Sequence, residues 1–308
     1  IYPCEEGQRV MLEVVILAAG EGKRMRSAQP KVLQPVGGQA MLGHLLEAVA
    51  ALSPHQVHVV VGQGAEAVRA EFPAFQGQWV EQTERLGTGH ATLQAIPHID
   101  PAARVLVLPA DMPLVRSATL QALVDESADL SVLTFMADDP TGYGRILRDA
   151  QDRVIDIREQ ADANAQEAMI KEVNSGVLVA DAQDLKRWLE GLVPQNAQGE
   201  YYLTDCIALA ASEGKRLSGV IAEDSRELMG ANDRAQLAIL EAVWQARCRH
   251  ELLMQGAILQ DARSVYIQGS VKVGQDVIIG PNVYFYGEVE LGDGVNIGPG
   301  CVVTNGQL

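Results

Sequence analysis

The chain has 308 residues, a formal net charge of −16 at pH 7, and 47% hydrophobic residues. A chain of this length can bury a sizeable core and is long enough for about two domains. The negative charge argues against nucleic acid or an anionic membrane as the main partner. No stretch of about 18 apolar residues is present, so we expect no transmembrane helix.

The cysteines and the amino-terminal residues bear on the cellular setting. Cys4, Cys206, Cys248 and Cys301 lie far apart and form no Cys-x-x-Cys pair, which predicts a reducing, cytoplasmic setting without structural zinc. Residues 1–10 lack the charged and apolar regions of a secretory signal, and we interpret them as a leader or as added residues.

From residue 14 to about 225, apolar segments alternate with amphipathic ones. Strands are predicted over 14–17, 57–61, 105–108, 130–135 and 177–180, and helices over 41–51, 65–71, 89–96, 117–125 and 182–192. This alternation predicts an α/β fold with a mostly parallel sheet covered on both faces. Ligands of such sheets bind beyond the carboxyl ends of the strands. A long helix over 232–255, capped by Asn232 or Asp233, is expected to lead away from this domain.

The last fifty residues repeat with a period of six. Valine recurs from Val265 to Val295, with Cys301 next in the series, and a second apolar series runs two residues later. This period predicts a parallel β-helix whose coils contain three hexads each. The pattern stops in mid-coil at Leu308, so we expect a truncated chain or an open end covered by another subunit.

The segment behind the first predicted strand has the composition of a phosphate-binding loop. It reads Leu-Ala-Ala-Gly-Glu-Gly-Lys-Arg-Met over 17–25 and is followed by Pro-Lys at 30–31. Glycines let backbone N–H groups approach phosphate oxygens, and we expect a helix N-terminus to follow the loop. The spacing excludes a Walker A loop, because Arg24 follows Gly22-Lys23, and a dinucleotide fingerprint, because Met25 replaces its third glycine. A plain turn of small residues is the alternative.

Polar residues beyond the other strands complete a candidate cleft. Asp111 follows a buried strand and is a candidate Mg²⁺ ligand, with Asn232 as a second oxygen donor. The alternative for both is a turn or helix cap. Gln82 and the segment 86–90 can hydrogen-bond a base edge or a phosphate, although a hairpin or a helix start would also explain them. Gly142–Arg145, Glu159 and 174–176 could bind sugar hydroxyls and an N-acetyl group, and taken alone they are weak signals.

The sequence contains no candidate Ser-His-Asp or Cys-His arrangement. A sugar 1-phosphate is mostly ionised near pH 7, because the second pKa of a phosphate monoester is about 6. Its attack on a nucleoside triphosphate therefore needs alignment and charge neutralisation rather than a general base.

These motifs resemble those of a known family. The loop at 17–25 with Pro30–Leu33 resembles the signature of sugar-1-phosphate nucleotidyltransferases. The segments 86–90, 139–146, 174–176 and 198–205, together with the hexads, make the chain similar to the bacterial bifunctional N-acetylglucosamine-1-phosphate uridylyltransferase/glucosamine-1-phosphate acetyltransferases.

The resemblance implies a Rossmann-like nucleotidyltransferase domain over 11–231, a linker helix over 232–256 and the first coils of a left-handed β-helix over 257–308. It implies Mg²⁺-dependent conversion of UTP and N-acetylglucosamine 1-phosphate to UDP-N-acetylglucosamine and diphosphate, for peptidoglycan and lipopolysaccharide synthesis. A homotrimer formed through the β-helix is expected. The acetyltransferase residues of the family would lie beyond Leu308, so we expect that second activity to be absent.

The resemblance also implies roles for individual residues. Arg24 and Lys31 would be catalytic and hold the triphosphate, and Asp111 and Asn232 would bind Mg²⁺. The uridine would contact Ala18, Ala19, Gly20, Gln82, Gly87 and Thr88, and Leu17 would be a further substrate-binding residue. The sugar would contact Gly144, Glu159 and Asn174, with Tyr201 and Thr204 nearby. One departure is Pro109-Ala110 before Asp111, where the family usually has glycine next to the aspartate; the alanine methyl is expected close to the ribose or sugar.

Two other functions stay open. One is a related transferase that uses dTTP or glucose 1-phosphate, and the other is a catalytically silent nucleotide-sugar sensor that keeps the fold. The presence of Arg24, Lys31 and Asp111 favours an active enzyme.

Overall fold

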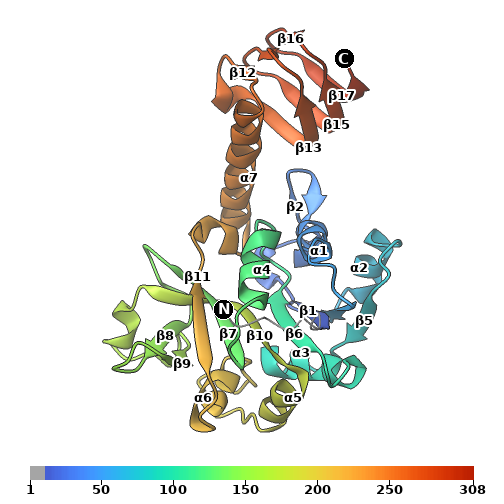
Figure 1. Ribbon diagram of the computed structural model, residues 1–308. Helices are drawn as coiled ribbons and strands as arrows, with labels where there is room; N and C mark the ends of the chain where they lie inside the picture. The colour runs from blue at the N-terminus through green and yellow to red at the C-terminus, as the bar shows by residue number, and fades with distance from the viewer. Residues whose placement is uncertain (1–10) are drawn as a thin grey trace, which may run out of the picture.

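The alternating segments build one nine-stranded sheet in the computed structural model, which describes residues 11–308 (Figure 1). The first ten residues, interpreted above as a leader, lie outside the described residues. The strand order is β11-β7-β10-β6-β1-β4-β5. These strands are β1 (Leu12–Ala18), β4 (Gln56–Val61), β5 (Gln78–Glu81), β6 (Arg104–Pro109), β7 (Leu130–Met136), β10 (Glu172–Asp181) and β11 (Leu217–Ile221). All five predicted strands are present.

The sheet is mixed, with parallel pairing in most of it. β1 pairs in parallel with β4 and β6, while β10 runs antiparallel to both β6 and β7. The strand β10 begins at Glu172, five residues before the predicted start at 177. Its register against β7 shifts between Asn174 and Val177, where the predicted part begins. The short strands β8 (Arg145–Arg148) and β9 (Val154–Arg158) extend from β10.

Helices cover both faces of the sheet, as the continuous apolar strands predict. One face buries Trp188, Leu185 and Cys206 from α5 (Ala182–Glu190) and α6 (Asp205–Ser212). The other face buries Leu42 and Leu120 from α1 (Met41–Ala50) and α4 (Ser117–Val124). The remaining helices of this part are α2 (Ala65–Glu71) and α3 (Thr88–Ala95). The five predicted helices are present, and α6 is an additional one.

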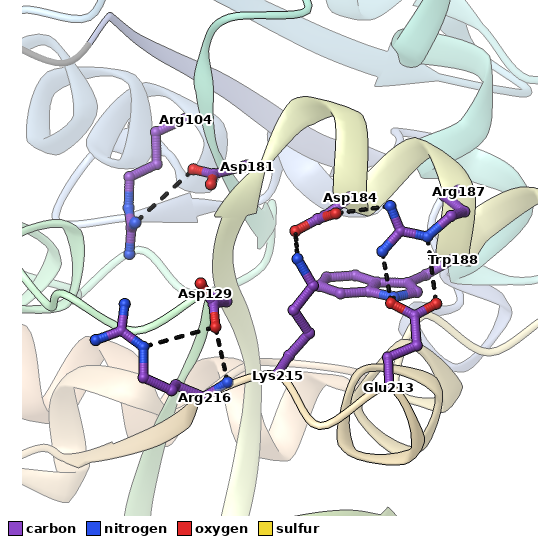
Figure 2. A network of polar contacts seen from close by, with 9 residues as sticks. All are labelled: Arg104, Asp129, Asp181, Asp184, Arg187, Trp188, Glu213, Lys215 and Arg216. Carbon is purple, nitrogen blue, oxygen red and sulfur yellow. Dashed lines mark hydrogen bonds and ion pairs between the residues drawn. The ribbon is translucent and has the colours of Figure 1, made fainter.

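A network of ion pairs lies at the edge of the sheet where the parallel strands begin (Figure 2). Arg187 of α5 bonds Asp184 and Glu213, and Lys215 bonds Asp184 at 2.5 Å. Asp181, at the end of the antiparallel β10, is paired in register with Arg104 at the start of β6. The network therefore fastens α5 to the chain after α6, at the edge opposite the carboxyl ends of β1 and β6.

The helix α7 (Arg234–Met254) connects the sheet to the carboxyl-terminal coils (Figure 1). Asp233 caps it by accepting a hydrogen bond from the N–H of Gln236 at 2.9 Å. Leu240 on this helix is buried against Met41 and Leu114, and Trp244 packs beside this cluster. Alongside α7 lies a short hairpin of β2 (Pro35–Val36) and β3 (Gln39–Ala40).

The hexads form the predicted parallel coils. β13 (Tyr266–Val273), β15 (Tyr284–Leu291) and β17 (Val302–Gln307) stack in one sheet, and β12 (Ile258–Leu259), β14 (Ile278–Ile279) and β16 (Asn296–Ile297) stack in another. Tyr266 pairs with Tyr284, and Tyr284 pairs with Val302, so each coil advances by 18 residues. Val265, Val277, Val283 and Val289 are buried inside, whereas Cys301, the next member of this series, is exposed.

None of the helices within residues 11–308 combines the length and the apolar character that a membrane crossing needs.

Candidate active site

A cleft of about 540 Å³ opens beyond the carboxyl ends of β1 and β6. Its lining includes Leu17, Ala18, Ala19, Gly20, Lys31, Gln82, Gly87, Thr88 and Asp111. These nine residues were all predicted as site residues. They meet because β1 and β6 are parallel neighbours, with Leu17 opposite Pro109, so their following loops leave the sheet at the same place.

The loop after β1 is shaped by a close approach of its own backbone to Lys31. Gly22 has φ +62°, and a Cβ at this position would lie 2.6 Å from Cβ of Lys31, so only glycine fits. The expected helix N-terminus after the loop is wrong, because only two single-turn 3₁₀ helices follow, Lys23–Met25 and Lys31–Leu33. Arg26 at φ +49° and Pro30 interrupt any longer helix. The next α-helix begins at Met41.

Lys31, Asp111 and Asn232 converge on one point at the side of the cleft. The Lys31 ammonium donates to Oδ2 of Asp111 at 2.5 Å and to Oδ1 of Asn232 at 2.7 Å. The two side chains of the ion pair are 12% and 20% exposed, so water reaches them poorly. Asn232 is held by its own N–H, which donates to Oε1 of Gln236 in the first turn of α7 at 2.6 Å. Three segments distant in sequence thus place one carboxylate and one amide oxygen around a cation.

This pair of oxygens suits a hard divalent cation that also binds substrate phosphates. Mg²⁺ is held in proteins by one or two carboxylates, with phosphates and water completing the shell. An ammonium already sits between the two oxygens, which shows that a cation fits there. Among residues 11–308 no group of three or more His, Cys, Asp or Glu side chains is placed to hold a metal ion. A metal ion at Asp111 and Asn232 would therefore need ligands from phosphate and water.

The segment around Gly87 forms the second wall of the cleft and is joined to the chain near residue 201. The N–H of Tyr201 donates to the carbonyl of Leu86 at 2.7 Å, and the hydroxyl of Thr88 accepts from the N–H of Leu203 at 3.0 Å. Gly87 has φ +108°, and a Cβ there would lie 2.5 Å from the carbonyl oxygen of Tyr201. Gln82 donates its amide to the carbonyl of Gly87 at 3.2 Å, which leaves its Oε1 as the group that can accept from a base.

A smaller cavity of about 120 Å³ adjoins the cleft and shares Leu17, Thr88 and Pro109 with it. Glu159, Asn174 and Thr204 contribute polar groups to its lining. The Thr204 hydroxyl donates to Oε1 of Glu159 at 3.0 Å. Burial raises the pKa of Glu159, and the Thr204 hydrogen bond partly opposes that shift. A carboxylate and an amide in a small, mostly apolar cavity are suited to binding hydroxyl and amide groups of one sugar ring.

Other predicted residues lie beside the two cavities rather than in their walls. Gly144 accepts from the N–H of Asn174 at 2.8 Å, and a Cβ on it would lie 3.4 Å from the Glu159 carboxylate. Tyr201 contributes its backbone, as described above. Arg24 is exposed on the loop and is not part of either lining.

The structure corrects one expectation and adds several lining residues. Ala110 is 1% exposed and packs into the core, so its methyl lines neither cavity, whereas Pro109 lines both. Glu21, Lys23, Arg85 and Glu200 also line the cleft. Glu21 pairs with Lys23 at 2.6 Å and with Arg85, which joins the two walls at the mouth of the cleft. The charged residues at 21, 23 and 24 were visible in the sequence, but the partner at 85 was not.

Comparison with known proteins agrees with this geometry. The model of the MobA-like NTP transferase domain matches residues 14–192, and the bacterial transferase hexapeptide model matches residues 270–305. The chain belongs to the MobA-like NTP transferase family. The first match covers β1, the glycine loop and Asp111, and the second covers the stacked coils.

Relatives of this MobA-like NTP transferase bear out the resemblance seen in its motifs. The chain is 49% identical over 269 residues to the bifunctional protein GlmU of Stenotrophomonas maltophilia strain R551-3, which covers 87% of this chain and 59% of that protein. It is 48% identical to the bifunctional protein GlmU of Stutzerimonas stutzeri strain A1501, covering 96% of this chain and 66% of that protein. The chain thus spans about three fifths to two thirds of the length of these relatives.

A solved structure supports the fold alone. The inositol-1-phosphate CTP transferase from T. maritima superposes with a TM-score of 0.58 at 17% identity, covering 75% of this chain and 93% of that one.

Proposed function

We propose that this chain transfers the uridylyl group of UTP to N-acetylglucosamine 1-phosphate, giving UDP-N-acetylglucosamine and diphosphate. The observation that carries the proposal is the convergence of Lys31, Asp111 and Asn232 beside a glycine-lined cleft. The identity to proteins named bifunctional protein GlmU supports this choice among sugar nucleotidyltransferases. The adjoining cavity with Glu159 and Asn174 supports an N-acetyl sugar as acceptor.

In this proposal the cleft binds the nucleotide and the smaller cavity binds the sugar. The backbone from Ala18 to Gly20 lies against the nucleotide, and Oε1 of Gln82 accepts from N3–H of uracil. Glu159 accepts hydrogen bonds from sugar hydroxyls, and Asn174 contacts the N-acetyl group. Because the two cavities share Leu17, Thr88 and Pro109, the sugar phosphate and the triphosphate would meet where these residues lie.

The chemistry is a displacement at the α-phosphorus of UTP. An oxygen of the sugar phosphate forms the new P–O bond, the bond between the α-phosphorus and the β-phosphate oxygen breaks, and diphosphate leaves with that electron pair. Lys31 donates to phosphate oxygens and stabilises their charge, and Arg24 is a second cation on the same loop. The attacking phosphate is already ionised, so no side chain has to remove a proton. A divalent cation, Mg²⁺ in our proposal, would be held by Asp111 and Asn232 and would neutralise phosphate charge when bound.

Release of diphosphate from defined substrate pairs tests the proposal. UTP with N-acetylglucosamine 1-phosphate and Mg²⁺ should give the fastest release, and a chelator should abolish it. Faster release with dTTP or with glucose 1-phosphate would indicate the related transferase instead. No release with any pair would indicate a silent sensor.

Substitution of the candidate metal ligand sharpens this test. Asp111→Ala should lower turnover about 100-fold or more while circular dichroism shows an unchanged fold. The matched control is Asp125→Ala, which removes an exposed carboxylate at the far end of α4 and should leave turnover intact. Full activity of the Asp111 variant would place the metal elsewhere.

We also propose that the carboxyl-terminal coils assemble three copies of the chain. The support is the hexapeptide match over 270–305 and the exposed apolar side chains of Ile258 and Val302 on the coils. The proposal includes a division of the chain into a nucleotidyltransferase domain over 11–231, a linker helix over 232–256 and the coils over 257–308. Light scattering in solution should give three times the mass of one chain, and a monomer mass would reject the trimer.

A further inference from the structure

Lys31 stands where a metal ion would bridge the two candidate ligands. Its Nζ lies 2.5 Å from Oδ2 of Asp111 and 2.7 Å from Oδ1 of Asn232, which follow Lys31 in the sequence by 80 and 201 positions. Both contacts end on the same nitrogen. The ammonium therefore satisfies the two oxygens that the proposed function assigns to a divalent cation.

We propose that Lys31 is a displaceable place-holder for the divalent cation. When metal and nucleotide bind, its ammonium group moves away from Asp111 and Asn232 and binds phosphate oxygens instead. This inference rests on the proposed function, because it takes these two oxygens as the metal ligands. It assigns Lys31 two successive positions, one between Asp111 and Asn232 and one against the triphosphate.

Burial explains why a place-holder is useful at this point. Asp111 is only 20% exposed, and an unpaired carboxylate with little access to water is costly. The Lys31 ammonium compensates that charge before a metal ion binds. Its side chain is 12% exposed and its stem is packed against Gly22, so the ammonium is positioned rather than free to move through solvent.

Phosphate provides the reason for Lys31 to leave. Two cations cannot occupy the space between the same two oxygens, and one carboxylate with one amide binds a free divalent ion weakly. Triphosphate oxygens supply further ligands for the metal and charged acceptors for the released ammonium. Lys31 thus couples metal binding to nucleotide binding, since each ligand favours the arrangement that the other needs.

Metal affinity in the absence of nucleotide tests the place-holder. Binding of Mn²⁺ alone is measured by electron paramagnetic resonance of the free ion, for the wild type, Lys31→Met and Lys23→Met. Lys31→Met should bind Mn²⁺ about tenfold more tightly than the wild type, because it removes a charge-assisted competitor. Lys23→Met is the control, since Lys23 lines the same cleft but pairs with Glu21. It should change the affinity less than about twofold, because an exposed charge is screened.

Each outcome decides the inference. An unchanged affinity of Lys31→Met, or an equal gain in both variants, overturns the place-holder. If Lys31→Met does not fold, acetylation of lysines in the wild type decides: saturating Mn²⁺ should increase labelling of Lys31 relative to Lys23, and unchanged or reduced labelling overturns the inference. Neither measurement needs turnover. Diphosphate release without the gain in Mn²⁺ affinity would reject only the place-holder, and the gain without any release would reject only the proposed function.

Discussion

Glu159 is the residue whose surroundings most clearly set its chemistry. Its carboxylate lines a small cavity, burial raises its pKa, and the Thr204 hydroxyl donates to it at 3.0 Å. A hydrogen bond to the ionised form lowers a carboxyl pKa, so Thr204 keeps Glu159 ionised to lower pH than burial alone would allow. Only the ionised form can accept hydrogen bonds at both oxygens.

Thr204→Val should therefore move the acid side of the pH profile to higher pH. Without the hydroxyl the pKa of Glu159 rises further, so the carboxyl group becomes protonated, and loses acceptor capacity, at a higher pH than in the wild type. The measurement is kcat/KM for the sugar phosphate as a function of pH. On the alkaline plateau of each profile the variant should stay within about tenfold of the wild type, the value of one hydrogen bond.

The control for this prediction is Thr204→Ser, which keeps the hydroxyl and should keep the wild-type profile. Asp205, whose pKa burial raises to about 6, and the phosphate of the substrate titrate in all three enzymes. Their contribution cancels in the comparison. Coinciding acid limbs for the valine and serine variants would show that the Thr204 hydroxyl does not tune Glu159.

Among the elements, the sequence predicted those whose side chains form a continuous apolar pattern. Strands such as β1 and β6 and the hexad coils are strongly patterned, and they occur where expected. β9 and β11 were missed because they are short and only partly buried, so their sequences carry little periodicity. The bulge between Asn174 and Val177 also hid the first part of β10.

The same limit applies to the parts of the candidate site. The carboxyl ends of β1 and β6 could be placed together in advance, because parallel neighbours leave the sheet at one edge. The ties from Leu86 and Thr88 to the chain at 201–203 could not, because they join segments more than 100 residues apart and each ends on a backbone N–H, of Tyr201 or of Leu203. Backbone contacts of this kind leave no residue pattern.

At the scale of the whole molecule, a buried polar joint on α7 connects this helix with the coils. Gln245 of α7 accepts from the N–H of Ile267 at 2.9 Å and donates to its carbonyl at 2.5 Å. It also donates to Glu241, which accepts from the N–H of Gly37 in the β2–β3 hairpin at 2.6 Å. Gln245 is 4% exposed, so water cannot replace these bonds. The side chain of Gln245 thus joins the coils to α7 and, through Glu241, to the hairpin.

Gln245→Leu should loosen this joint while leaving the chemistry intact. The change leaves two buried backbone groups of Ile267 without partners, each costing about 1–3 kcal/mol. Hydrogen exchange followed by mass spectrometry should show faster exchange in peptides covering Gly37 and Ile267, with the strands of the sheet unaffected. Diphosphate release should be unchanged, because Gln245 is roughly 20 Å from Asn232 along the axis of α7, at a rise of about 1.5 Å per residue.

The matched control is Gln255→Leu. Gln255 is exposed, and its Oε1 accepts a hydrogen bond from the N–H of Val273 in the same coils at 3.3 Å. Water can replace that bond, so exchange near Gly37 and Ile267 should stay at the wild-type rate. Equal exchange in the two leucine variants would mean that Gln245 does not hold the joint. In that case the apolar packing of Leu252 and Cys248 of α7 against the coils would have to position them.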